Sequence, residues 1–282
     1  MTTTVKQPRV RLISRELKLV ALMAQHWFRE FDQLFRFPAN YTTLDLETSG
    51  LNPATKLICT YGYTVVRDHK PVETREVVLD WSRHPDADII GLQKDLSDVQ
   101  RAFERKGKVL HHTYEYLTSQ GIDPIQALND LLLLVETAEN NKEILILHNG
   151  WAFDIEFIKA AFHNWLRIRW EFEPNLIYDS GIIEKASQLP ERFAPLPLPG
   201  ETMKAFATRI HAIRSHVKWN LDTHCAERYG LMQKANLITD DMHKASTDAL
   251  AVHYLVEEHY KLANIADQLD PDSQDNQSVV GE

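Results

Sequence analysis

The sequence predicts an α/β protein built on a mixed sheet. Three β-rich segments follow one another between residues 41 and 80, and short turns join them. From residue 123 onward, helical and strand-like segments alternate, a pattern typical of helices that cover a sheet. A separate helical stripe precedes all of these segments, because apolar residues recur at steps of three and four over 12–35.

The stripe at 12–35 predicts an extra N-terminal helix, which Pro38 and Asn40 end. Trp27, Phe28 and Phe31 lie in this segment and could stack on nucleic-acid bases. At helical spacing, however, aromatic residues form core far more often. We therefore expect the helix to pack on the sheet or to serve a partner.

Strands are predicted at 41–47, 57–66 and 72–80, where β-branched and aromatic residues gather. The connections carry the turn residues Ser49-Gly50, Asn52-Pro53 and Asp68-His69. Such short connections favour an antiparallel meander. The polar stretch 82–110 that follows predicts one short helix.

The second half predicts alternating elements. Asp123-Pro124 is typical of an N-cap followed by proline at the first helical position, and it begins a helix to about residue 138. The remaining segments are a buried strand at 143–149, a helix at 151–165, a strand end at 176–188 that runs into another helix, a proline-rich loop at 193–200, a basic helical segment to residue 218, and helices near 220–229 and 243–262.

Composition places the chain among ordinary globular proteins. It has 282 residues, 44% of them hydrophobic and 25% charged, which is enough for a full core. The net charge of −9 argues against a protein that coats nucleic acid by bulk charge, but it allows an enzyme with local basic patches. The start lacks a secretory pattern, no run reaches membrane length, and Cys59 and Cys225 show no CxxC spacing. We expect a cytoplasmic protein without a membrane partner.

The segment YTTLDLETSG places two carboxylates two residues apart. Side chains at i and i+2 of a strand point to one face, so Asp45 and Glu47 would lie side by side. Like charges at that range disfavour ionisation of both, and a bound cation removes this problem. By itself, the motif could equally be an exposed edge-strand pair.

Three further residues are candidate partners of this pair. Asp154 lies in a helix that leaves the end of a buried strand, where the sites of α/β sheets gather. His243 and Asp248 are five residues apart near the start of the last helix, a step that does not share one helical face. Four acids and one histidine suit two hard divalent cations, Mg²⁺ or Mn²⁺.

These motifs resemble the DnaQ-like DEDDh 3′–5′ exonucleases. The resemblance rests on Asp45-x-Glu47 with Thr48-Ser49-Gly50, on Asp154 within HNGWAFD and on His243-x-x-x-x-Asp248, in the order and spacing of the family over about 41–260. YDS at 178–180 and WNLDTHCAERYGL at 219–231 also resemble family segments. The step of five residues from Asn149 to Asp154 is similar to the third motif of the TREX-type enzymes.

The resemblance implies an RNase H-like fold, with a mixed five-stranded sheet flanked by helices. The exonuclease domain would span 39–264, with insertions near 82–110 and 190–218. Residues 1–38 would form an N-terminal helical extension, and the acidic tail 265–282 would be disordered, because it is polar and lacks aromatics.

The resemblance also implies roles for the five polar residues. Asp45, Glu47 and Asp248 would hold the first ion, and Asp45 would bridge to the second. Asp154 would act at the second ion partly through water. His243 would be the general base that activates water.

Further residues would bind substrate. By the same resemblance, Thr48 and the backbone around Leu46 would contact the 3′-terminal nucleotide, Leu51 would be an apolar wedge at the terminal base, and Asn149 would orient substrate or a neighbouring loop. From charge alone, the segment 201–218 is a candidate to track the phosphate backbone. Its cations include Arg209 and Arg214, and a solvated helix face is the alternative.

The sequence thus predicts a metal-dependent 3′–5′ exonuclease that releases nucleoside 5′-monophosphates from a single-stranded or frayed 3′ end. DNA is favoured as substrate. The alternatives are an RNA-trimming enzyme of the RNase T or oligoribonuclease kind and a polymerase-associated proofreading or scaffold subunit. The sequence is compatible with a homodimer and with a polymerase or repair protein as a partner.

Overall fold

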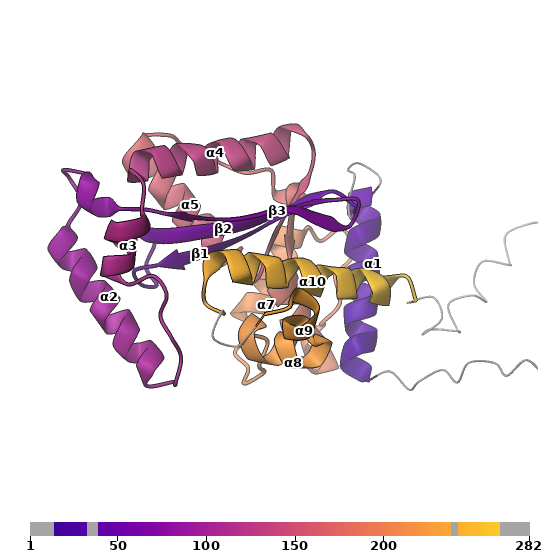
Figure 1. Cartoon of the computed structure of the whole chain (residues 1–282). Helices are drawn as coiled ribbons and strands as arrows, with labels where there is room; N and C mark the ends of the chain where they lie inside the picture. Colours follow the sequence, from indigo (N-terminus) through magenta and orange to yellow (C-terminus); the bar gives the residue numbers. More distant parts are fainter. Residues whose placement is uncertain (1–13, 33–38, 238–241, 266–282) are drawn as a thin grey trace, which may run out of the picture.

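A five-stranded mixed sheet forms the centre of the protein (Figure 1). The computed structural model describes residues 14–32, 39–237 and 242–265. The strands are β1 (Tyr41–Thr48), β2 (Ile58–Arg67), β3 (Lys70–Val78), β4 (Ile144–Leu147) and β5 (Ile177–Asp179). Their order in the sheet is β3-β2-β1-β4-β5. This architecture confirms the predicted fold class.

Helices cover both faces of the sheet. Figure 1 shows α4 over one face and α10 across the other. The helices are α1 (Arg15–Asp32), α2 (Ile89–Glu104), α3 (Tyr114–Gln120), α4 (Pro124–Asn140), α5 (Asp154–Ala161), α6 (Ser180–Ser187), α7 (Met203–Ala212), α8 (Ala226–Tyr229), α9 (Leu231–Ala235) and α10 (Ala245–Ala263). The 3₁₀ turns are η1 (Trp81–Arg83), η3 (Pro174–Leu176) and η4 (Glu191–Phe193), and the π-helical turns are η2 (Phe162–Leu166) and η5 (Leu221–Cys225).

Strand pairing follows the predicted meander and then changes direction. β1 to β3 pair antiparallel, whereas β4 is parallel to both β1 and β5. β4 pairs with β1 only over Tyr41–Thr43, so the C-terminal half of β1 extends past β4. Backbone groups of β1 near Leu46 are therefore left for partners other than β4.

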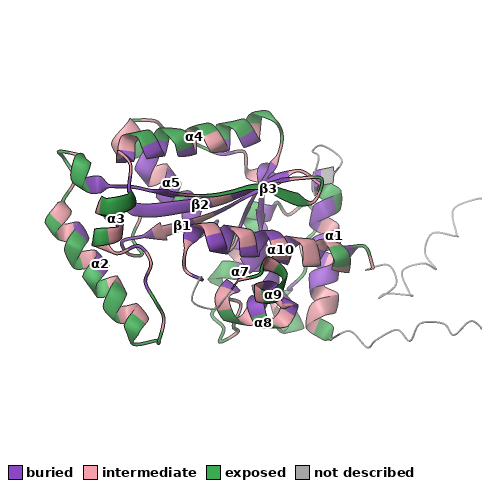
Figure 2. Ribbon diagram, in the orientation of Figure 1, coloured by how far each residue is buried: buried purple, intermediate pink, exposed green. Residues whose placement is uncertain are grey.

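The core lies on both sides of the central strands (Figure 2). Leu44 and Leu46 of β1 are buried, as are all four residues of β4. By contrast, the first six residues of the edge strand β3 are exposed. The central strands β1 and β4 are therefore packed on both faces, whereas most of β3 faces solvent.

One glycine sets the distance between the sheet and α10. A Cβ at Gly62 on β2 would lie 2.1 Å from the carbonyl carbon of Ala245, which is far closer than non-bonded atoms approach. Gly62 pairs with Asp45 in the neighbouring strand. The missing side chain thus lets the first turn of α10 approach the acidic part of β1.

Helix α1 packs into the core, as the spacing of its apolar residues predicted. Trp27 is 3% exposed and lies 5.7 Å from the ring of Phe206 on α7, measured between ring centroids. The ring of Phe28 lies 5.5 Å from that of Tyr178 on β5. These aromatic residues are therefore core residues and are not free to stack on bases.

Two boundary predictions need correction. The segment 82–110 contains the 16-residue helix α2, not one short helix, because Leu92 and Leu96 bury one stripe while Asp88 caps its start. The basic helix α7 ends at Ala212, before the predicted residue 218. The predicted domain limits stay predictions, and the acidic tail from residue 266 lies outside the described residues. None of the described helices is both long and apolar enough to cross a membrane.

Candidate active site

The site begins at the C-terminal half of β1. Asp45 and Glu47 lie two residues apart on this strand and are partly buried, whereas the alternating Leu46 is buried. The electrostatic neighbours of Asp45 are Asp248, Glu47 and Asp154. The fold therefore brings the four acids of the sequence motifs together.

Asp154 reaches β1 from the first residue of α5. Its side chain is buried, and its Oδ1 accepts a hydrogen bond of 3.1 Å from the backbone N–H of Leu46. That N–H is available because β4 has already ended at this point. The bond fixes the carboxylate of Asp154 beside the two acids of β1.

Asp248 arrives from the opposite face, in the first turn of α10. It is 7% exposed, and its Oδ1 accepts the backbone N–H of His243 at 3.3 Å. His243 has a positive φ of 68°, so the chain turns sharply just before the helix. This turn places the histidine next to the acid five residues away.

The electrostatics of the cluster are unfavourable without a counter-charge. Burial raises the pKa of Asp154 to about 8 and that of Asp248 to about 7. Burial, together with the charges of the other acids, also raises the pKa of Asp45 and of Glu47 well above the usual range. The fold thus concentrates negative charge in a place where it is poorly solvated.

The cluster has the donor set of a divalent metal site. One ligand atom each of Glu47, His243 and Asp248 lies within 4.8 Å of the others. Carboxylate oxygens are the preferred ligands of hard cations, and a bound cation would offset the repulsion among these acids. The residues present therefore fit a divalent cation.

His243 is held by a residue that sequence reasoning missed. Its Nε2 lies 3.2 Å from Oδ2 of Asp222, and Asp222 also pairs with Lys108. Partial burial alone would raise the pKa of Asp222, but the hydrogen bonds from His243 and Lys108 hold it well below its usual range. The sequence signal was the position of Asp222 within the segment 219–231.

His112 is a second residue that sequence reasoning missed. It is 2% exposed, and among the described residues neither ring nitrogen has a hydrogen-bond partner. Its Nδ1 lies 3.7 Å from Oε2 of Glu47. Burial lowers its pKa to about 4, so the ring is neutral at physiological pH.

A cavity of about 590 Å³ adjoins Glu47. The end of β1 forms one wall and α2 forms the other. Leu51 stands at this cavity with 85% of its surface exposed. Phe153 and Phe103 add aromatic lining, and the ring of Phe103 lies 5.1 Å from that of His243. The cavity is thus largely apolar and opens beside the acids.

Thr48 and Asn149 both have structural partners. The hydroxyl of Thr48 donates to the carbonyl of Gly50, and Thr48 lines the cavity. The backbone N–H of Asn149 donates to Asp179, while its side-chain oxygen is buried without a partner among the described residues. Thr48 shapes the wall of the cavity, and Asn149 lies at the turn after β4.

Arg209 and Arg214 do not join the cluster. The guanidinium of Arg209 is paired with Glu201 and donates to the carbonyls of Ala194 and Leu196. It therefore ties the proline-rich loop to α7. Arg214 is exposed beyond the end of that helix, and neither arginine is among the residues that line the cavity.

The fold is similar to that of exonuclease I from E. coli. Its zinc-bound complex with ssDNA is 14% identical, with a TM-score of 0.50 over 80% of this chain and 42% of exonuclease I. Its complex with a dA16 oligonucleotide is 13% identical, with a TM-score of 0.47, and the match again covers 80% of this chain and 42% of exonuclease I. This chain thus spans less than half of exonuclease I. No family model matches the sequence, and no curated protein matches it.

Proposed function

We propose that the protein is a metal-dependent 3′–5′ exonuclease that acts on single-stranded ends of nucleic acid, with DNA favoured. The observation that carries the proposal is the convergence of Asp45, Glu47, Asp154 and Asp248, with His243, beside a cavity. The fold shared with exonuclease I supports it, because that protein binds ssDNA and zinc in its described complexes.

The four acids would hold divalent cations, with Glu47 and Asp248 nearest to His243. Such ions, when bound, make water more acidic and stabilise charge on the oxygen that leaves phosphorus. The carboxylates would set the positions of the ions, because hydrogen bonds hold two of these side chains in place. Asp154 is fixed by the N–H of Leu46, and Asp248 by the N–H of His243.

His243 would accept the proton of the attacking water. An imidazole that donates from Nε2 to Asp222 keeps a lone pair on Nδ1 for that proton. Asp222 would then hold the ring in one orientation and stabilise its charged form, while the pairing with Lys108 fixes Asp222. The reaction would yield a 3′-hydroxyl on the shortened strand and a nucleoside 5′-monophosphate.

The cavity would bind the terminal nucleotide. Its volume of about 590 Å³ lies within the range of small-ligand sites. Thr48 and the backbone near Leu46 would contact the sugar end, and exposed Leu51 would act as a wedge at the base. Phe103 and Phe153 offer apolar surface on which a base could stack.

The proposal is tested with a 5′-labelled single-stranded DNA oligonucleotide. With Mg²⁺ we expect a ladder of products shortened from the 3′ end, and EDTA should abolish it. Asp45→Asn and His243→Ala should each reduce the rate by about 10²–10⁴-fold. Full activity in EDTA or in either variant would contradict the proposal. An RNA oligonucleotide of the same sequence tests the RNA-trimming alternative.

A further inference from the structure

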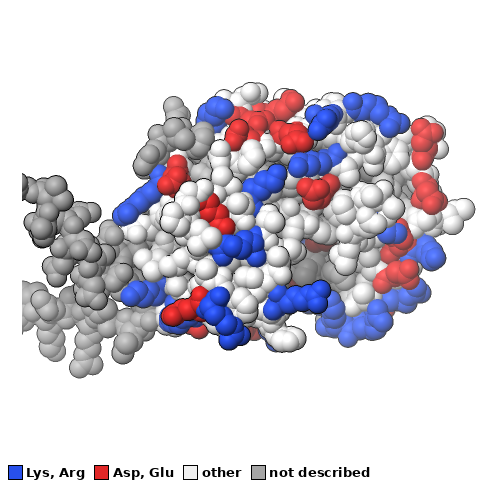
Figure 3. Space-filling view, turned by 180° about the vertical axis from the view of Figure 1, so that it is seen from behind, with Lys and Arg blue, Asp and Glu red and all other residues white. Residues whose placement is uncertain are grey.

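A basic segment lies at the C-terminal end of α2. RAFERKGK, residues 101–108, holds four cations against one acid, so its charge is four minus one, +3, in a chain of net charge −9. Figure 3 shows Lys and Arg side chains gathered at the lower right, where this end of α2 lies in that view. The protein is therefore locally basic in this segment, although its net charge is negative.

This segment borders the candidate active site. Lys106 and Phe103 line the cavity that also contains Glu47. A second, more open hollow is lined by Asp98, Arg101, Glu104 and Arg105, and Asp98 belongs to both. The two hollows thus meet at Asp98, and the surface continues from the cavity onto the outer face of α2.

Within the described part of the chain, three of the four cations have either a weak ion pair or none. Arg101 pairs with Asp98, but their side chains are 67% and 54% exposed, and such pairs contribute little stability. Arg105 is exposed and donates to the carbonyl of Arg101, and Lys106 is exposed as well. Lys108 differs, because it is ion-paired with the half-buried carboxylate of Asp222.

The acids near this surface are already compensated in part. Asp95 pairs with Lys56, and Glu104 accepts a hydrogen bond from Gln100. Asp98 has Arg101 as its partner. A phosphate could therefore replace Asp98 at Arg101 without leaving an unpaired buried acid, since both side chains are in contact with water.

We propose that this end of α2 binds the incoming single strand of nucleic acid, with Arg101, Arg105 and Lys106 at its phosphates. The inference rests on the proposed function, because a strand whose last nucleotide occupies the cavity must leave it over a neighbouring surface. A polyanion matches the charge of 101–108. The surface on α2 takes the place that the sequence had assigned to Arg209, whose guanidinium is engaged within the fold.

The test compares a charge-removing triple variant with two matched controls. The test variant is Arg101→Gln with Arg105→Gln and Lys106→Gln, all exposed positions. The first control removes three exposed cations elsewhere, through Lys70→Gln, Arg75→Gln and Lys261→Gln. The second control keeps the charge at α2, through Arg101→Lys, Arg105→Lys and Lys106→Arg. Thermal melting of each variant checks that the fold is intact.

Binding of a fluorescent oligothymidylate is measured in EDTA over a series of salt concentrations. Each phosphate contact to a single strand contributes about 0.7 to the slope of log affinity against log salt, so the test variant should lose about 2 from that slope. Its affinity at low salt should fall by about tenfold or more. Both controls should keep the wild-type slope.

Hydrolysis by the same variants separates this inference from the proposed function. The test variant should lose more kcat/KM on the oligothymidylate than on a dinucleotide. A wild-type salt slope in the test variant, or an equal loss in the first control, would overturn the inference even if the wild type is an exonuclease. If the wild type bound the strand through α2 but did not hydrolyse it with Mg²⁺, the surface would stand and the proposed function would fail.

Discussion

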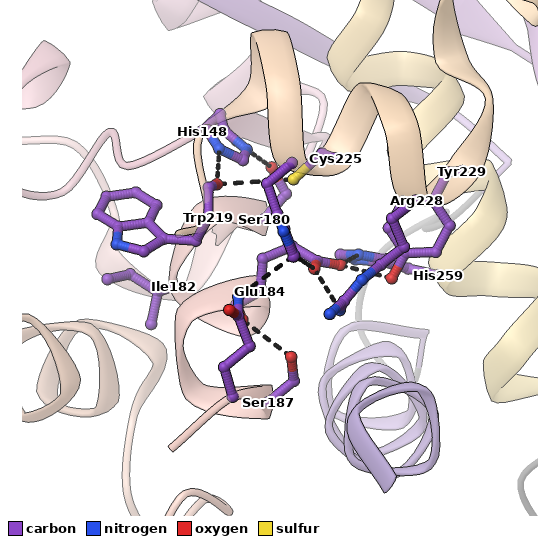
Figure 4. Close-up of polar contacts among 12 residues, drawn as sticks. His148, Ser180, Ile182, Glu184, Ser187, Trp219, Cys225, Arg228, Tyr229 and His259 are labelled. Carbon is purple, nitrogen blue, oxygen red and sulfur yellow. Dashed lines mark hydrogen bonds and ion pairs between the residues drawn. The ribbon is translucent and has the colours of Figure 1, made fainter. Parts of the chain in front are cut away.

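Two buried acidic regions of this protein differ in what surrounds their carboxylates. Glu184 on α6 is fully buried and has a partner for each oxygen: His259 at 2.9 Å and Tyr229 at 2.6 Å on Oε1, and Arg228 at 2.9 Å on Oε2 (Figure 4). Burial would raise the pKa of Glu184, but these partners hold it below the usual range.

The acids around Asp45 are in the opposite situation. Asp154 and Asp248 each accept a backbone N–H, but burial still raises their pKa to about 8 and about 7. Asp45 and Glu47 face other acids. Burial alone therefore does not mark a functional site. A ligand site is indicated where buried carboxylates have no cationic partner within the protein.

The histidines follow the same division. His148 is bonded on both ring nitrogens, to Ser180 and to the carbonyl of Trp219 (Figure 4). His112, beside Glu47, has neither nitrogen bonded to a described residue. Of these two histidines, the one beside the acidic cluster is thus the one whose ring lacks a hydrogen-bond partner among the described residues.

The largest expected effect lies in the compensated region. Glu184→Ala would leave Arg228 and His259 without their shared carboxylate. Loss of one partner from a buried ion pair costs about 3–5 kcal/mol. Urea denaturation should show a loss of this size, whereas a loss below about 1 kcal/mol would mean that the Glu184 contacts do not hold α6, α8 and α10 together.

The contribution of the acidic cluster to the free energy of unfolding should fall as the pH rises, whereas that of an ordinary paired acid increases. Asp248 has a folded pKa of about 7, above its ordinary value, so its protonated form is favoured on folding. In metal-free protein this contribution is lost as the pH rises from about 4 to about 7. Asp248→Asn removes this titration and keeps an acceptor for the N–H of His243.

The measurement is the free energy of unfolding of wild type and Asp248→Asn in EDTA at several pH values. The free energy of unfolding of the variant should exceed that of the wild type by an amount that grows from pH 4 to pH 7. This difference should become smaller when Mg²⁺ is added in excess of EDTA. A constant difference across this range would show that Asp248 is not in an uncompensated environment.

A smaller effect is expected at Asp222, which contacts the ring of His243. Asp222→Asn should lower kcat by about 10–100-fold, the usual effect of losing a residue that orients a site histidine. KM should change little, because Asp222 is not among the residues that line the cavity. Steady-state kinetics on single-stranded DNA decides this, and a change confined to KM would count against an orienting role.

The sequence identified what depends on local pattern. The two-residue period of a strand predicted that Asp45 and Glu47 lie on one face of β1. The pair Asp123-Pro124 predicted the start of α4, where Asp123 caps the helix. Asp222 and His112 were missed because their importance depends on contacts with segments far away in the chain.

The sequence predicted which cations are available for phosphate less well than it predicted which strand residues share a face. Arg209 looked available for phosphate, but the fold pairs it with Glu201, eight residues earlier. Helix α2 was predicted too short because its exposed polar residues outnumber the buried Leu92 and Leu96. The cations of 101–108 follow these leucines in the chain. Only the folded arrangement places them beside the cavity.

Cation binding by the acidic cluster tests the central claim most directly. Isothermal titration of metal-free wild type with Mn²⁺ or Mg²⁺ should show binding at about pH 8, close to or above the pKa of Asp154 and Asp248, because hard cations bind the ionised carboxylates. Asp45→Asn with Asp248→Asn should remove that binding while the protein stays folded. Equal binding by wild type and this double variant would contradict the claim that these acids form the metal site.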